Sequence, residues 1–309
     1  MISNNYKIAV IGTGLMAHGI VQEFAQAGCE ILMIGRSQKS VNNALTNITE
    51  NLENLQKNGI ISQSEIRKTF SRIHTGLSIE IIPNDTDIVI ESVLEDLDLK
   101  QSIFLQLENV CSDETIITSN TSSYPPSRLS DKMRKPERFM NTHYFNPPYL
   151  IPLIEIVKSE KTDEKLVLKI FDMFTKMGKI PIVLRKEFPG FIANRLQVAM
   201  LREALYVVEN GVADAADVDT VIKNSIGRRW AVAGVFEVCE LAGLDLFMKI
   251  AYELQPTLNS SIEVSKLLVD KVEKGETGAK SGMGFYKWTP ELVAIIKNKI
   301  AQQFLSMRK

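Results

Sequence analysis

Side chains that could form disulfides or hold metals are scarce in this sequence, which has only three cysteines and three histidines among 309 residues. The cysteines, Cys29, Cys111 and Cys239, are odd in number and lack the spacing of metal ligands. Buried thiols in a reducing compartment are therefore expected. No metal site is predicted.

Long apolar runs and an excess of one charge are also absent. No apolar stretch approaches the roughly 18 residues of a membrane-spanning helix. Polar residues 1–6 lead straight into a short strand, which is unlike a signal peptide. The net charge is -1, and no block of like charge would attract nucleic acid. We expect a cytoplasmic protein that binds a small molecule, without a nucleic-acid or membrane partner.

A glycine-rich turn near the start of the chain carries the first functional pattern. The apolar residues 8–11 are followed by Gly12, Gly14 and Ala17, and then by a helical pattern that ends at Gly28. This is the spacing of a dinucleotide fingerprint, whose glycines permit the tight turn and the close approach of a pyrophosphate. The predicted cofactor residues are Gly12, Gly14, Leu15, Met16 and Ala17. The alternative is a tight turn without a ligand.

The end of the second expected strand bears on the choice between NAD and NADP. An acid at this place would accept hydrogen bonds from the ribose 2′-OH and repel a 2′-phosphate, but Gly35 stands there, followed by Arg36. A guanidinium suits a phosphate better than a hydroxyl, which favours NADP. Alternatively, Gly35 is a turn residue, Arg36 points to solvent, and Glu30 or another acid serves NAD.

The distribution of strands and helices predicts two domains. Up to residue 188, short apolar strands alternate with helices, which is typical of an α/β domain with a doubly wound, Rossmann-type sheet. Residues 189–309 have almost no strand pattern and are expected to form an all-helical domain for substrate binding and dimerisation. Its main helices are predicted at residues 191–209, 236–252, 260–274 and 290–307.

A histidine and an acid are expected on neighbouring strands. His143 lies in an expected strand at 138–145, and the prolines after Asn146 force a turn, so residues 153–157 can return beside it. Glu155 is the lone acid of that apolar strand and needs a partner if it is buried. The pair would form a carboxylate-oriented imidazole that can act as a general base. Considered alone, His143 would be a core histidine whose hydrogen bonds are made within the protein, and Glu155 would be an edge-strand acid that faces water.

Further polar residues are expected at the same sheet edge and after the domain boundary. Asn120 and Ser122 follow a strand, where they could serve cofactor and substrate or simply form a polar turn. Asn194 interrupts the apolar start of the first helix of the second domain. On residues 39–71, an expected pair of helices could form an arm over the cofactor.

Taken in order, these motifs resemble the 3-hydroxyacyl-CoA dehydrogenases nearly from end to end. The matching segments are Glu91-x-x-x-Glu95-x-x-x-x-Lys100, residues 119–123, His143-x-x-Asn146-Pro147, residues 190–195 and residues 281–286. The resemblance implies hydride transfer between a nicotinamide and a 3-hydroxy group. It implies His143 as base, Glu155 as its orienting partner, Ser122 and Asn194 as donors to the reacting oxygen, and cofactor contacts from Glu95 and Lys100. It also implies a homodimer formed by the helical domain.

The substrate class is less defined than the chemistry. Residues 146–155, 193–197 and 227–230 look more like the branch of λ-crystallin (gulonate dehydrogenase) and carnitine dehydrogenase, which oxidises small polar hydroxy acids. We predict a 3-hydroxyacyl-CoA substrate, with a free hydroxy acid as the alternative and a non-catalytic nucleotide-binding relative as the second alternative. The candidate substrate residues are Ser122, Asn146, Lys57, Lys68, Arg72, Arg229 and Trp230.

The basic candidates have simpler interpretations as well. Lys57, Lys68 and Arg72 could bind the phosphates of CoA or could belong to a solvated helix face. Arg229 and Trp230 could hold a carboxylate or a cation, or could end a helix whose dipole favours basic residues.

Overall fold

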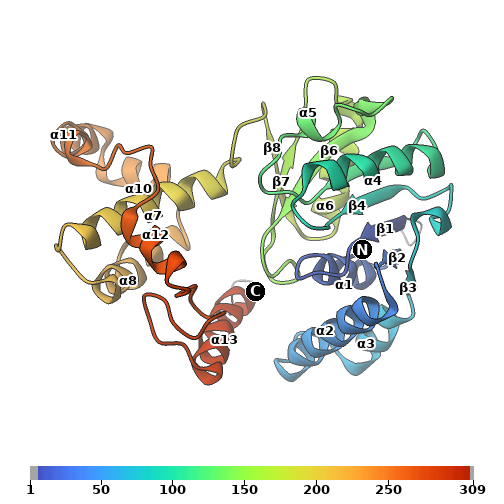
Figure 1. Ribbon diagram of the computed structural model, residues 1–309, viewed down its shortest axis with the longest axis horizontal. Coiled ribbons are helices and arrows are strands. Elements are labelled where there is room, and N and C mark those ends of the chain that lie inside the picture. The colour runs from blue at the N-terminus through green and yellow to red at the C-terminus, as the bar shows by residue number, and fades with distance from the viewer. Residues whose placement is uncertain (1–5, 307–309) are drawn as a thin grey trace. The chain divides into compact units, whose positions relative to one another are not determined.

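The computed structural model describes residues 6–306 and divides into two compact units (Figure 1). Within the described residues, the first unit comprises residues 6–192 with 304–306, and the second comprises residues 193–303. The expected end of the last helix at Met307 lies outside the described residues.

The first unit contains one sheet in the order β3-β2-β1-β4-β5-β6-β7-β8. All neighbouring strands are parallel except β6 and β7. The chain builds outward from β1 and then continues with β4 on its other side, so the predicted doubly wound sheet is confirmed. The strands are β1 (Lys7–Ile11), β2 (Glu30–Ile34), β3 (Ile73–Gly76), β4 (Ile88–Glu91), β5 (Ile116–Ser119), β6 (Phe139–Tyr144), β7 (Leu153–Val157) and β8 (Ile180–Leu184).

Helices cover both faces of this sheet. Side chains alternate along a strand, so Ile8 and Val10 join the core under α1, α2 and α6, whereas Ala9 and Ile11 join the core under α4 and α5. The helices are α1 (Ala17–Ala27), α2 (Gln38–Lys57), α3 (Gln63–Phe70), α4 (Leu97–Val110), α5 (Pro126–Leu129) and α6 (Glu164–Lys176), with single 3₁₀ turns η1 (Ile79–Ile81) and η2 (Pro136–Arg138).

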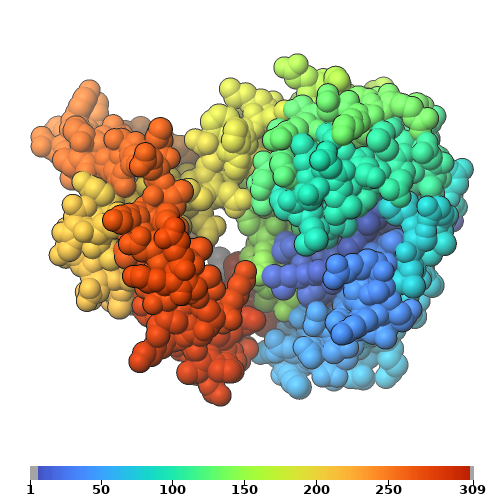
Figure 2. Space-filling view, in the orientation of Figure 1, coloured from blue at the N-terminus to red at the C-terminus, as the bar shows by residue number. Residues whose placement is uncertain are grey.

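The two helices expected as an arm form at α2 and α3. Each begins with a serine in a capping box, Ser37 and Ser62, which satisfies the free N–H groups of its first turn. Figure 2 shows the two helices side by side at the surface in blue. The apolar side of α2, from Val41 to Leu52, belongs to the main core, so α2 is anchored along most of its length.

The second unit is helical within its described residues. It contains α7 (Ala193–Glu209), α8 (Ala215–Asn224), α9 (Ile226–Trp230), α10 (Val235–Ala242), α11 (Leu244–Leu254), η3 (Gln255–Thr257), α12 (Lys266–Glu273) and most of α13 (Pro290–Ser306). The single helix predicted at 236–252 is wrong, because Gly243 has a φ of 98° and separates α10 from α11. The helix predicted from residue 260 begins only at Lys266.

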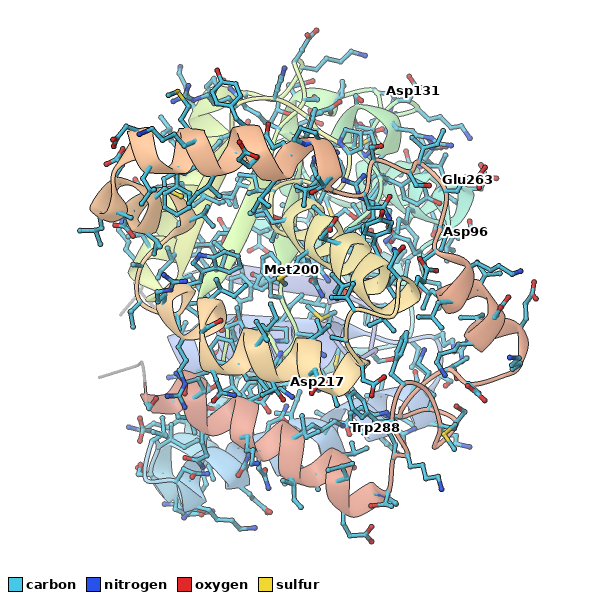
Figure 3. All side chains as sticks on the ribbon, turned by 90° about the vertical axis from the view of Figure 1, so that its left-hand side faces the viewer. Asp96, Asp131, Met200, Asp217, Glu263 and Trp288 are labelled. Atoms are coloured by element: carbon cyan, nitrogen blue, oxygen red, sulfur yellow. The ribbon has the colours of Figure 1, made fainter. Side chains whose placement is uncertain are left out.

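Many apolar side chains of the helical unit are exposed in the single chain. Phe236 and Leu241 on α10 are 83% and 85% exposed. Met200, labelled on α7 in Figure 3, is also exposed, and Leu205 is the only buried large apolar side chain of α7. Within residues 6–306, no helix combines the length and apolar character needed to cross a membrane.

Candidate active site

The predicted fingerprint turn joins β1 to α1 and has the geometry of a phosphate cradle. Gly12 has a φ of 128°, and a Cβ there would stand 2.2 Å from the carbonyl oxygen of Ser92, so only glycine fits. Gly14 is exposed, with nothing within 4 Å of the position of a Cβ, which leaves its backbone open to a ligand. Since α1 has no acid in its first turn, its N–H groups suit a pyrophosphate.

The other fingerprint residues support this turn. Ala17 is buried, Met16 caps α1 through its backbone position, and Leu15 is 65% exposed beside Gly14. His18, which sequence reasoning left without a role, has Nδ1 2.9 Å from the carbonyl oxygen of Gly14. Burial lowers the pKa of His18, which favours a neutral ring in the glycine turn.

The end of β2 carries no acid. Gly35 is buried, and a Cβ there would lie 2.6 Å from Cγ2 of Val41 and 2.9 Å from Cγ2 of Thr13. Arg36 is exposed, and the first turn of α2 also lacks an acid. Glu30 lies at the opposite end of β2, beside Lys7, and its carboxylate pairs with His74 at 2.9 Å. Glu30 is therefore at the wrong edge of the sheet to serve the ribose.

The structure brings His143 and Glu155 together. They face each other in the antiparallel register of β6 and β7, with His143 Nδ1 2.8 Å from Glu155 Oε2. The Glu155 side chain is fully buried and that of His143 nearly so. A carboxylate only accepts, so Nδ1 carries the proton and Nε2 is left for the substrate. The second oxygen, Glu155 Oε1, accepts a hydrogen bond of 3.0 Å from the backbone N–H of Ile192.

Two aromatic rings enclose the imidazole. The Phe145 ring is 4.6 Å from that of His143, and the Phe191 ring meets it edge-on at 5.4 Å. Phe191 was expected inside a helix, but it precedes α7 and has a φ of 52°. Sequence reasoning missed its role; the only local signal is its place after Pro189 and Gly190.

Glu95 and Lys100, expected at the cofactor, belong to a network of charged side chains at the end of β4. Lys100 is 1% exposed, and its Nζ lies 2.7 Å from Glu91 Oε1 and 3.2 Å from Glu95 Oε2. Glu91 also accepts a 2.6 Å hydrogen bond from Ser119 Oγ, and Glu95 accepts one from Thr121. Lys100 thus holds the exposed carboxylate of Glu95 in place from inside the protein.

Asn120 and Ser122 lie just beyond β5. Asn120 accepts a hydrogen bond of 3.0 Å from the backbone N–H of Tyr144, and its Nδ2 is 3.3 Å from Ser92 Oγ, so it ties together the ends of three strands. The half-buried hydroxyl of Ser122 has no hydrogen-bond partner among the described residues.

The loop after His143 is fastened to α1. Asn146 is exposed in this loop. Lys179 Nζ donates to the carbonyl oxygens of Pro148 at 2.7 Å and Ile151 at 2.9 Å, and it pairs with Glu23 of α1. A Cβ on Gly19 of α1 would be 2.9 Å from Pro148 Cδ, so the loop lies directly on the helix backbone.

The remaining candidate residues lie on other elements of the structure. Asn194, half-buried, is the second residue of α7 in the helical unit. Lys57 and Lys68 are exposed on α2 and α3, whereas Arg72 donates to the carbonyl oxygen of Ala25 at 3.1 Å near the end of α1. Arg229 and Trp230 are the last two residues of the short helix α9, which agrees with the alternative that they end a helix.

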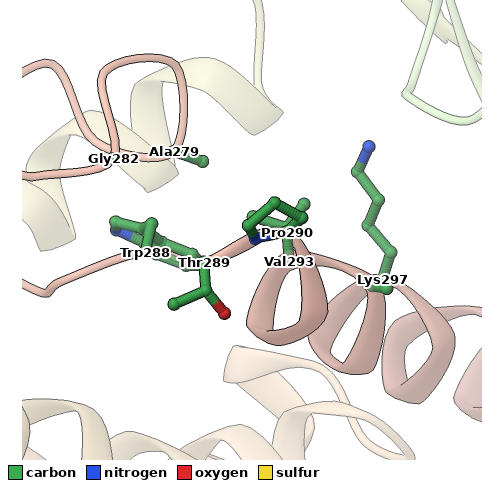
Figure 4. Close-up of a pocket in the computed structure, with 8 residues that line it drawn as sticks. Ala279, Gly282, Trp288, Thr289, Pro290, Val293 and Lys297 are labelled. Atoms are coloured by element: carbon green, nitrogen blue, oxygen red, sulfur yellow. The ribbon is translucent and has the colours of Figure 1, made fainter.

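Two further features of residues 6–306 bear on function. No group of three or more histidine, cysteine or acidic side chains is arranged to hold a metal ion. An open hollow of about 540 Å³ lies within the helical unit beside Trp288, Pro290 and Lys297 (Figure 4). None of the candidate residues lines it.

The chain matches known proteins over nearly its whole length. Residues 7–188 match the family model of the 3-hydroxyacyl-CoA dehydrogenase NAD binding domain, and residues 190–288 match that of the C-terminal domain. The mitochondrial hydroxyacyl-coenzyme A dehydrogenase of Sus scrofa is 32% identical over 91% of this chain and 90% of that protein.

A second relative is named for a substrate that is not a CoA thioester. The 5-formyl-3-hydroxy-2-methylpyridine 4-carboxylate 5-dehydrogenase of Mesorhizobium japonicum is 30% identical over 98% of this chain and 97% of that protein. A crystal structure of an enzyme of that activity, described as an NAD+ dependent dismutase, has a TM-score of 0.90 at 30% identity and covers 98% of this chain and 97% of its own.

A third similarity is to a solved (S)-3-hydroxybutyryl-CoA dehydrogenase from Ralstonia eutropha. Its TM-score is 0.76 at 27% identity, over 92% of this chain and 99% of its own. Both domain models and relatives at 30% identity or more span this chain, which therefore belongs to the 3-hydroxyacyl-CoA dehydrogenase family.

Proposed function

We propose that this chain oxidises a substrate hydroxyl with His143 as general base. The observation that carries the proposal is the 2.8 Å contact between His143 Nδ1 and the buried Glu155 carboxylate. It fixes the tautomer, so Nε2 takes the hydroxyl proton while Glu155 stabilises the imidazolium that forms. A bound nicotinamide supplies the hydride acceptor.

Two further side chains are assigned to the reacting oxygen. Ser122 has a hydroxyl without a partner among the described residues, at the carboxyl edge of the sheet. Asn194 follows Ile192 by two residues, and Ile192 is hydrogen-bonded to Glu155. In the proposal both donate hydrogen bonds to the oxygen as charge develops on it, which stabilises the transition state.

The direct test is His143→Gln, which keeps much of the side-chain volume but removes the base. We expect kcat to fall by at least about 10² with nearly unchanged cofactor affinity. A near-normal kcat for the His143→Gln enzyme would disprove the proposed mechanism.

For the cofactor we propose a preference for NADP over NAD. Support comes from the buried Gly35, the exposed Arg36 and the lack of an acid in the first turn of α2, while Glu30 is held at the far edge by His74. Without an acid there is no acceptor for the 2′-OH and no repulsion of a 2′-phosphate. The test compares kcat/KM for the two cofactors.

Two substrate classes remain candidates, a 3-hydroxyacyl-CoA and a small hydroxy acid without CoA. The first is supported by the named 3-hydroxyacyl-CoA relatives. The second is favoured by the alignment with the pyridine carboxylate dehydrogenase, which covers 98% of the chain and so includes most of α13, a helix beyond the C-terminal family model. Moreover, Arg72, one of the three basic residues suggested to bind the phosphates of CoA, donates a hydrogen bond to a backbone carbonyl oxygen near the end of α1.

We favour the small hydroxy acid on these grounds. The deciding assay offers acetoacetyl-CoA and a panel of free polar 3-hydroxy, 3-keto and aromatic hydroxy acids, each with both cofactors. Turnover of free acids alone, abolished by Arg229→Ala, supports the small-acid class and a role for Arg229. Turnover of thioesters alone, with a KM that rises on Lys57→Ala or Lys68→Ala, supports the CoA class.

We also propose a homodimer formed through the helical unit. Support comes from the large apolar side chains that this unit exposes on α7 and α10, because exposed apolar patches are typical of protein–protein interfaces. Light scattering should give twice the chain mass of 34.7 kDa. Phe236→Glu with Leu241→Glu should shift the protein toward the monomer.

A further inference from the structure

We propose that Phe191 is a positioning residue that fixes the orientation of both members of the His143–Glu155 pair. This inference rests on the proposed role of the pair in catalysis. It assigns to Phe191 two contributions, one from its backbone and one from its ring.

The backbone contribution begins with an unfavourable conformation. Phe191 is the only non-glycine residue with a positive φ among residues 6–306, at 52°. A bulky side chain rarely adopts this region, and such residues persist where the surrounding structure determines them. Here the surroundings are the preceding Gly190, itself at a φ of 74°, and a hydrogen bond of 3.0 Å from the Phe191 N–H to the carbonyl oxygen of Phe188.

The result of this turn is a directed N–H group. The N–H of the next residue, Ile192, donates to Glu155 Oε1, while Glu155 Oε2 faces His143 Nδ1. Each carboxylate oxygen thus has its own partner, and the carboxylate plane cannot rotate without losing one of them. The left-handed turn at Phe191 therefore determines which oxygen receives the imidazole N–H.

The ring contribution acts on the imidazole. Phe191 is 2% exposed and packs with Val157 and Leu184 in a small separate core, from which its ring meets His143 edge-on at 61°. Phe145 lies against the same imidazole. Since aromatic edge contacts prefer defined geometries, the two rings limit rotation of His143 about its χ2 angle.

The experiment compares two variants in the same small core. Phe191→Leu keeps most of the apolar volume but removes the ring, whereas Leu184→Ala removes a buried apolar side chain of the same core, opposite Val157 in the register of β7 and β8. We expect Phe191→Leu to lower kcat at least about tenfold, since small misplacements of catalytic groups are costly. KM and cofactor affinity should change less than about twofold.

The control separates positioning from stability. Leu184→Ala should lower the melting temperature at least as much as Phe191→Leu, yet leave kcat within about threefold and the acid limb of the kcat–pH profile in place. In Phe191→Leu that limb should move, because the imidazole is no longer held against its carboxylate. If Phe191→Leu fails to fold, Phe191→Gly, whose backbone is unstrained at this φ, supports the same comparison.

Two outcomes must be told apart. If Phe191→Leu matches Leu184→Ala in kcat and pH profile while His143→Gln is inactive, the inference about Phe191 is wrong and the catalytic pair stands. If His143→Gln retains full activity, the proposed function itself fails.

Discussion

Converting the cofactor preference should require two substitutions, because the end of β2 is packed against α2. A Cβ added at Gly35 would approach Val41 Cγ2 to 2.6 Å and Thr13 Cγ2 to 2.9 Å. Val41 is 1% exposed and belongs to the main core, so its side chain cannot move aside without disturbing that close packing. We expect Gly35→Asp alone to cost on the order of 1–3 kcal/mol of stability, as overpacking usually does. The displaced carboxylate then gains little affinity for NADH.

The companion substitution is Val41→Ala, which removes the methyl group that obstructs the new side chain. Alone it should cost about 1.6 kcal/mol, from two buried carbon groups at about 0.8 kcal/mol each. In the double variant the aspartate Cβ fills part of the vacated space. The combined loss should therefore be smaller than the sum of the single losses, with a coupling of roughly 0.5–3 kcal/mol.

The assay measures urea unfolding and kcat/KM with NADH and NADPH for the wild type, both single variants and the double variant. Val41→Ala is the control and should keep the wild-type preference. Only Gly35→Asp/Val41→Ala should prefer NADH, since its carboxylate can reach the ribose. The reasoning is refuted if Gly35→Asp alone is as stable as the wild type and already prefers NADH.

Three other predictions address the cofactor contact, the base and the thiols. Arg36→Ala should weaken NADPH about ten- to a hundred-fold, the value of a charge-assisted hydrogen bond of roughly 1.5–3 kcal/mol, and hardly change NADH; equal losses in titrations of both cofactors would contradict the assignment. Glu155→Gln should lower kcat with little change in cofactor affinity, because a neutral amide no longer stabilises the imidazolium; stopped-flow hydride transfer at the wild-type rate would disprove this. Burial raises the pKa of the Cys29 and Cys111 thiols to about 11, so few thiolates form below that pH, and iodoacetamide at pH 8 should label the half-exposed Cys239 first. Mass spectrometry of the folded protein that finds Cys29 or Cys111 alkylated equally fast would count against that order.

The parts of the fold that local patterns specify could be predicted from the sequence. The fingerprint turn and the strand carrying His143 are marked by glycine spacing and by an Asn-Pro-Pro turn, so their neighbours follow from general sheet rules. The short edge strand β3 was missed because its residues are partly exposed and include His74 and Gly76, which carry no strand pattern.

Contacts that depend on how a helix packs on the sheet, or on an unusual backbone conformation, could not be predicted from the sequence. Lys100 looked like a cofactor contact, but its ammonium is enclosed by Glu91 and Glu95, and only the packing of α4 on the sheet reveals this. The left-handed Phe191 was likewise hidden, because nothing in the residue itself favours that conformation. The break at Gly243 was overlooked because both flanking segments are apolar and helical.

The attachment of the loop after His143 to α1 bears on how new specificities evolve in this scaffold. Lys179 holds the loop by two carbonyl oxygens and is paired with Glu23 on the helix that also carries the dinucleotide turn. Gly19 leaves no space between helix and loop. An insertion in residues 145–152 would therefore disturb the cofactor side together with the substrate side. Across relatives with different substrates we expect this loop to keep its length, and selectivity to change by exchange of side chains on an unaltered backbone.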